Sequence, residues 1–355
     1  MEPGNTVSEG LDLNRILRID VKGFKVAVAK VPVRKPHWQL TGPTQPAAIA
    51  ASAPGQATIR IALDDVAGLA SMGLLIGRLG ALSIRGRCRL VAGEQEVAAE
   101  ILGDPSGGFQ RHAGDAEWSI LPDGAPAPLA LEPRTPLEIF ELFGKPRPFY
   151  CDAIGVWVEV LRFLADPGVG LAGLAMQPAV GQIARFCHQD HGLRYNTQNG
   201  KASFFPGTVE AIFQLSRYLQ AGALQPVNCY DQAAAIQALA GALGIKVQYR
   251  FLQPCGHINV VDLVGVGLCN NPFFENPHGS FPAQPIVVAG TPRSSFANHT
   301  FSQLEDQVYD ACAGPPVGVH PPGAYLARLI DDTVPQVHGG LANIVAATEG
   351  VLKVV

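Results

Sequence analysis

The chain has 355 residues and a formal net charge of −4, and 47% of its residues are hydrophobic while only 16% are charged. This length predicts two domains, and the composition supplies enough apolar residues for a core in each. The small acidic charge, without any block of Lys and Arg, argues against nucleic acid as a partner.

The cysteine count and the N-terminal sequence indicate in which cellular compartment the protein is expected. There are 7 cysteines, an odd number with irregular spacing, which favours free thiols in a reducing environment over a disulfide framework. The first ten residues lack the basic and apolar stretch of a secretory signal. We therefore expect a cytoplasmic protein, with signal-independent export left open.

Residues 1–140 carry strand patterns. The runs 57–63, 82–90 and 116–121 alternate apolar and other residues, and turns containing Gly, Pro and Asp separate them. The pattern is typical of a sandwich or barrel-like module, and we predict a β-sandwich-like N-terminal domain over residues 1–140. Arg85 and Arg87 share a strand face that we expect to be solvated. No motif in this domain carries chemistry, so it could bind a partner, shield a cleft or simply pack.

An apolar stretch within this region approaches the length of a membrane-spanning helix. Residues 66–84 contain a single charge, Arg78, but four glycines weaken a helix, and acidic and basic residues flank the stretch. We predict a short buried helix that runs into a strand, and no association with a membrane.

The second predicted domain covers residues 141–355. Prolines in the segment 144–148 mark its beginning, and helical patterns follow at 155–164, 177–190 and 208–220. Helices that precede a sheet predict an α+β core.

The most informative stretch is residues 226–245, which predict a buried helix with a cysteine in its first turn. Asn228 is a preferred N-cap residue, Asp231 suits the positive end of the helix dipole, and Gly244 suits a left-handed C-terminal cap. Cys229 would lie beside unpaired N–H groups, a position that favours the thiolate. A buried, inert cysteine is the alternative interpretation.

A histidine and an aspartate downstream could complete a catalytic set. His299 and Asp310 lie 11 positions apart, in two strand-like runs around a plausible turn at Glu305 and Asp306. A four-residue loop would put His299 opposite Asp310, and a two-residue turn would make them diagonal neighbours. Both registers place the two side chains on one face of the sheet, where a carboxylate can orient an imidazole.

The order of these segments resembles the transglutaminase-like core of the papain-type cysteine peptidase superfamily. The matching text is Asn228-Cys-Tyr-Asp-Gln-Ala at a helix start, then Asn298-His-Thr-Phe, then Tyr309-Asp. The resemblance covers roughly residues 170–315. It implies Cys229 as the nucleophile, His299 as the proton shuttle and Asp310 as the residue that orients the histidine. Transglutaminases also carry a β-sandwich ahead of the catalytic core, an analogy of fold alone.

Two alternatives stay open at the site. The stretch between the helix and His299 is longer than the family usually has, so His257, on another strand-like run, is an alternative base. Cys187 and His188 with His191, and Cys255 with His257, are possible metal ligands, but no Cys-x-x-Cys pair has structural zinc spacing. We expect neither a metal nor a cofactor.

The expected activity is thiol-dependent acyl transfer at an amide carbonyl of a protein or peptide substrate. A Cys229 thioester would be hydrolysed, so that a peptide bond, an isopeptide bond or a glutamine side-chain amide is cleaved. Transamidation onto an amine acceptor follows the same path. A catalytically silent binding or structural protein with this fold is the alternative from a different class.

Overall fold

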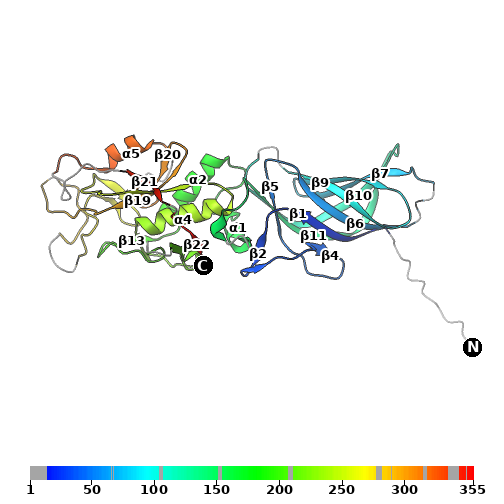
Figure 1. The fold of residues 1–355 in the computed structure, drawn as a ribbon, viewed down its shortest axis with the longest axis horizontal. Helices are drawn as coiled ribbons and strands as arrows, with labels where there is room; N and C mark the ends of the chain where they lie inside the picture. The colour runs from blue at the N-terminus through cyan, green and yellow to red at the C-terminus, as the bar shows by residue number, and fades with distance from the viewer. Residues whose placement is uncertain are drawn as a thin grey trace, which may run out of the picture. The chain divides into compact units, whose positions relative to one another are not determined.

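The computed structural model describes residues 14–355 except 65, 67, 104–106, 151–153, 207–210, 277–281, 289, 315–317, 335–343 and 349, and only the backbone of 344–348. The chain divides into two units, Met1–Val26 with Val31–Leu142 and Ala27–Lys30 with Phe143–Val355. Figure 1 shows their elements in chain order.

The first unit is built on a sheet that closes on itself. Its strands are β1 (Arg15–Lys22), β4 (Trp38–Gln39), β5 (Ala47–Ala50), β6 (Gly55–Leu63), β7 (Met72–Leu79), β8 (Leu82–Arg89), β9 (Gly93–Leu102), β10 (Gln110–Pro122) and β11 (Leu129–Leu142). The strand order is β4-β1-β6-β9-β8-β7-β10-β11-β5, and β1 also pairs with β11. That extra pairing, Arg15 with Glu132, closes a barrel of β1, β6, β9, β8, β7, β10 and β11.

The closed barrel corrects the predicted sandwich. Alternating burial along β6 and β8 puts Ile59, Ile61 and Ile84 in the interior, while Arg85 and Arg87 point to solvent as expected. A strand with one buried face has the same alternation in a sandwich and in a barrel. Only the pairing of the first strand with the last distinguishes the two, and the strand patterns contain no information about it.

The apolar stretch at 66–84 also adopts a different structure from the buried helix that we predicted. Its described part contains no helix, and residues 72–79 form β7, whose side chains alternate between the barrel interior and the outer surface. Gly77 lies against Trp118, since a Cβ there would come within 2.4 Å of the indole ring. Among the helices of the described residues, none combines the length and apolar character needed to cross a bilayer.

The second unit surrounds one buried helix, α4 (Cys229–Ala242), in which every residue except Tyr230 is buried. The helix packs against a four-stranded antiparallel sheet, in the order β20-β19-β16-β21, and against α1, α2 and α3. The bounds are β16 (Gln248–Leu252), β19 (His299–Leu304), β20 (Gln307–Tyr309), β21 (Ile344–Thr348), α1 (Val158–Leu164), α2 (Met176–Arg185) and α3 (Leu215–Leu219).

Shorter elements complete this unit. They are β12 (Val156–Trp157), β13 (Arg194–Tyr195), β14 (Ile212–Phe213), β15 (Pro226–Val227), β17 (Val261–Leu263), β18 (Gly267–Cys269), β22 (Lys353–Val354), α5 (Pro322–Leu329), a 3-10 turn η1 (Pro148–Tyr150) and a π-helical turn η2 (Phe186–Asp190). Two further strands lie near the start of the chain, β2 (Val26–Val28) and β3 (Val31–Pro32). The helix predicted at 208–220 is a strand followed by a short helix, and its residues 207–210 lie outside the described part.

The C-terminal cap of α4 forms as the sequence indicates. Gly244 has φ of 85°, Gly244 N donates to Gly241 O, and Ile245 N donates to Ala240 O at 3.0 Å. This is the double hydrogen bond of a Schellman cap, which needs a residue with positive φ. The helix therefore ends at a defined point, and the chain enters β16 in a fixed direction.

Candidate active site

Cys229 is the first residue of α4, and the turn that holds it is capped from both sides. The Asn228 side chain accepts from Asp231 N at 3.1 Å, and the Asp231 carboxylate accepts from Asn228 N at 3.2 Å. This reciprocal capping box satisfies two N–H groups that a helix start leaves open.

The helix start is also tied to a preceding loop. Asp231 accepts hydrogen bonds from the backbone N–H groups of Ser203, Phe204 and Phe205 at 2.6–2.8 Å. The Asn228 amide donates to Gly200 O at 2.9 Å. These bonds fix the position of Cys229, whose exposed fraction is 4%.

His299 is the first residue of β19, and Asp310 directly follows β20, the second strand of the same hairpin. Ser302 pairs with Tyr309 and Leu304 with Gln307, so the connection is the two-residue turn Glu305-Asp306. Of the two predicted registers, this is the tighter one, in which the two residues are diagonal neighbours. His299 Nε2 lies 2.8 Å from Asp310 Oδ2, and both residues are 1% exposed.

Tyr325, on α5, is the third member of this buried network, and the sequence did not point to it. Its hydroxyl donates to Asp310 Oδ2 at 2.5 Å and lies 3.2 Å from His299 Nε2. The other carboxylate oxygen accepts from Cys312 N at 2.7 Å and Ala313 N at 3.1 Å. No sequence pattern relates this tyrosine of α5 to Asp310, so only the folded chain brings the two residues together.

The electrostatics follow from these contacts. Burial opposes a charged imidazole, but the charge and hydrogen bond of Asp310, with a contribution from the Cys229 thiol, raise the pKa of His299 to about 10. Burial also works against a charged Asp310. The pKa of Asp310 is nevertheless lowered, because three groups together outweigh the effect of burial: the His299 charge, the Tyr325 hydroxyl and the Cys312 N–H. The pair is therefore an imidazolium and a carboxylate at neutral pH.

Packing of α4 on β19 brings the helix start toward His299. Ser302 Oγ, on β19, donates to Ala233 O in the first turns of the helix at 3.2 Å. His299 Nε2 is occupied by Asp310 and Tyr325, which leaves Nδ1 for the thiol side. Nδ1 has no hydrogen bond of ordinary geometry in the described structure, although the Cys229 thiol influences the His299 charge.

The alternative base, His257, has a different environment. Its backbone oxygen accepts from Asp331 N at 3.0 Å, and its imidazole lies near Arg293 and Asp331. Burial and the Arg293 charge lower the pKa of His257. The charged groups that act on the pKa of His257 are Arg293 and Asp331, whereas Asp310 and Cys229 act on the pKa of His299.

Three other groups near the thiol complete the site. Burial, with the Cys229 charge as a lesser cause, raises the pKa of Cys255 and of Cys312. Burial also raises the pKa of the Tyr195 hydroxyl, and the charge of Cys312 and, to a lesser degree, that of Cys229 contribute to this shift. The six cysteines within the described residues are all free thiols. No group of three His, Cys, Asp or Glu side chains in the described ranges could hold a metal ion.

Comparisons with known proteins give no sequence match and one similar solved structure. No protein-family model and no curated protein matches the sequence. Among solved structures, the chain is similar to the transglutaminase of red sea bream, with a TM-score of 0.43 and 11% sequence identity. The alignment covers 76% of this chain and 49% of that enzyme, so the chain spans about half its length.

Proposed function

We propose that the protein is a cysteine-dependent acyl-transfer enzyme that acts on an amide carbonyl of a protein or peptide, most simply by hydrolysis. The observation that supports it is the buried set of Cys229, His299 and Asp310. In this set, Asp310 binds one imidazole nitrogen and leaves the other for the thiol. An oriented imidazole beside a thiol at a helix start is the arrangement that activates a nucleophile.

In the proposed mechanism, Cys229 Sγ attacks the carbonyl carbon as a thiolate, with His299 as the imidazolium. The tetrahedral intermediate collapses, the C–N bond breaks, and His299 Nδ1 gives its proton to the leaving amine. A Cys229 thioester remains. Water then attacks the thioester while His299 Nδ1 takes a proton from it, and the C–S bond breaks to release the acid and restore the thiol pair. An amine in place of water would give transamidation.

The tetrahedral intermediate needs donors for its oxyanion. The backbone N–H of Cys229, at the helix start, is the first donor in this proposal. Tyr195 is the second: it pairs with Val227, two residues before Cys229, and a Cβ on Gly200 would lie 3.3 Å from its hydroxyl. The carbonyl of Gly200 in turn accepts from the Asn228 amide. Tyr195→Phe should lower turnover without changing the rate of Cys229 alkylation.

The first experiment measures thiol reactivity. Iodoacetamide is added at about pH 6, where an ordinary thiol is almost entirely protonated, and labelled peptides are quantified by mass spectrometry. Cys229 should label faster than Cys255 and Cys312, which serve as internal controls because burial raises their pKa. His299→Gln should remove the advantage, and the matched change His257→Gln should leave it intact.

The second experiment identifies the reaction. A peptide library is incubated with the wild type or with Cys229→Ala, with and without a primary amine, and the products are analysed by mass spectrometry. Cleaved peptides, deamidated glutamines and amine adducts distinguish the three outcomes of the thioester. No difference between wild type and Cys229→Ala in any product class would contradict the proposal.

One observation favours the silent alternative, a binding or structural protein. Cys229 and His299 are 4% and 1% exposed, so a substrate carbonyl reaches the sulfur only if covering residues move. Slow and equal alkylation of all the thiols would support this alternative, because a resting protein with a closed site would protect Cys229 as it protects the other cysteines.

A further inference from the structure

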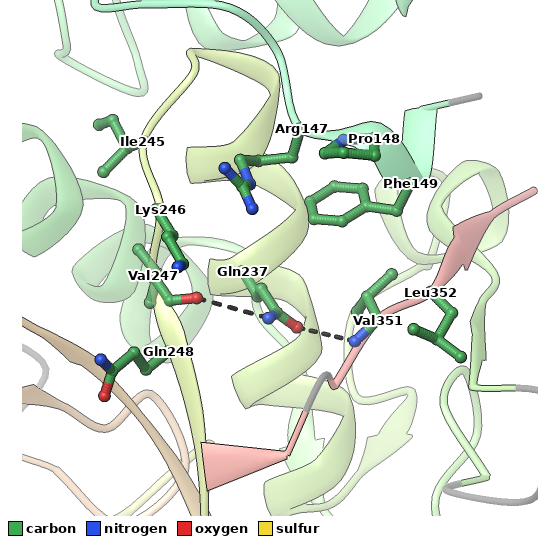
Figure 2. Close-up of a pocket in the computed structure, with 10 residues that line it drawn as sticks. All are labelled: Arg147, Pro148, Phe149, Gln237, Ile245, Lys246, Val247, Gln248, Val351 and Leu352. Atoms are coloured by element: carbon green, nitrogen blue, oxygen red, sulfur yellow. Dashed lines mark hydrogen bonds between the residues drawn. The ribbon is translucent and has the colours of Figure 1, made fainter. Parts of the chain in front are cut away.

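A cavity of about 310 Å³ lies within the second unit, away from Cys229 (Figure 2). Gln237, in the middle of α4, is part of its wall, and it stands eight residues after Cys229, which is about 12 Å along the helix axis. Segments 147–149, 245–248 and 351–352 form the rest of the lining. The cavity thus lies along the C-terminal half of α4, whereas the proposed catalytic thiol lies at its N-terminus.

The charged residues that the structure describes in the lining of this cavity have one sign. Arg147 and Lys246 line it, and no Asp or Glu is among the lining residues that the structure describes. Neither cation forms an ion pair or a side-chain hydrogen bond with any described residue. Figure 2 shows their charged ends turned toward the same space beside α4. Two unpaired cations in a concave site attract an anion.

Arg147 is held in place by close packing on α4. Its backbone N donates to Gly241 O at 2.9 Å. A Cβ on Gly241 would come within 2.3 Å of the Phe149 ring and 3.0 Å of Arg147 Cγ, so both side chains lie directly on the bare helix backbone. The stem of Arg147 is therefore fixed before any ligand arrives, which reduces the entropy that binding must overcome.

The remaining walls are also joined to one another. The Gln237 amide donates to Val247 O at 3.4 Å and accepts from Val351 N at 2.8 Å, so one side chain links the helix to both neighbouring segments. Phe149, Val351 and Leu352 add apolar surface to the lining. A preformed concave site that combines apolar walls with a few convergent charged groups has the character of a ligand pocket.

We propose that this cavity binds a small organic anion in which a carboxylate is attached to an apolar group. Arg147 and Lys246 hold the carboxylate, and the apolar group lies against Phe149 and Leu352. Arg147 presents N–H groups in a planar fork that suits a carboxylate, and Lys246 adds a second positive charge.

The test uses a pair of probes that differ only in charge. N-acetyl-leucine and its neutral amide are titrated into the full-length protein by isothermal calorimetry at low salt. The acid should bind with a millimolar dissociation constant, as expected for a ligand of its size, and the amide should bind at least about tenfold more weakly. Inorganic phosphate, which has charge without an apolar group, should also bind more weakly than the acid.

Variants locate the binding. Arg147→Gln and Lys246→Gln should each weaken binding of the acid by about tenfold, because each removes charge-assisted hydrogen bonds. Arg185→Gln, which removes an exposed cation of α2 outside the cavity, should leave the affinity unchanged. Lys246 is exposed, so its variant keeps the fold even if Arg147→Gln disturbs the packing on Gly241.

Four results would each overturn the proposal. Equal affinity for the acid and the amide would remove the role of charge, and phosphate binding as tightly as the acid would remove the role of the apolar walls. Unchanged affinity in Lys246→Gln, or no saturable binding of the acid below about 10 mM, would show that the cavity is not the site.

Discussion

Tyr325→Phe tests whether the buried network around Asp310 has the charges inferred for it. The substitution removes one hydroxyl and keeps the ring, so it leaves the packing on Phe301 in place. The lost bond is a 2.5 Å hydrogen bond to a fully buried carboxylate. Hydrogen bonds to charged groups contribute about 1.5–3 kcal/mol, and we expect the free energy of unfolding to fall by that amount.

Tyr309→Phe is the matched control. Tyr309 is also buried and precedes Asp310 directly, but its hydroxyl makes only a 3.5 Å contact with Gln177 O. A bond at this limit of distance contributes about 0.5 kcal/mol or less. The two variants should therefore differ by about 1 kcal/mol or more in urea denaturation at pH 7.

A second measurement separates the charge network from packing alone. The Tyr325 hydroxyl helps to lower the pKa of Asp310, so its loss should raise that pKa. The ionised carboxylate holds His299 as an imidazolium. The hydroxyl stabilises the ionised carboxylate more than the protonated acid, so the stability lost in Tyr325→Phe should shrink as the pH falls through the pKa of Asp310, whereas the small loss in Tyr309→Phe should not depend on pH. Equal stability of the two variants at pH 7, together with a loss in Tyr325→Phe that does not change with pH, would refute the inferred network.

Three further predictions concern pH and the helix ends. Between pH 6.5 and about 10 the native state holds a proton on His299 that the unfolded chain has lost, so wild-type stability should fall with rising pH by at most about 1.4 kcal/mol per unit. His299→Gln should flatten this slope in urea titrations across the same range, and a parallel slope would contradict the assignment. Asn228→Ala should cost about 1–2 kcal/mol in the same assay and slow Cys229 alkylation, because it removes the cap that positions the thiol. Gly244→Ala should destabilise the protein by more than Gly173→Ala. Both glycines have a positive φ, but only a Cβ at position 244 would meet backbone atoms, within 2.3 Å of Gly144. Equal melting temperatures of the two variants would exclude that clash.

Local features of the second unit follow from the sequence because each depends on a few neighbouring residues. Asn228, Asp231 and Gly244 define the two ends of α4 through hydrogen bonds within the helix or next to it. The hairpin that carries His299 and Asp310 is similarly local, since either turn length puts both residues on one face of the sheet. Such features need no knowledge of the rest of the chain.

The long-range arrangement was decided only by tertiary packing. The closing pair of the barrel, Arg15 with Glu132, joins residues that no pattern relates, so the predicted sandwich could not be distinguished from a barrel. Tyr325 reaches Asp310 from a separate helix, and Arg147 reaches the far side of α4 because Gly241 leaves room for it. Periodicity tells which face of an element is buried, whereas the partner of that face depends on how distant elements fit together.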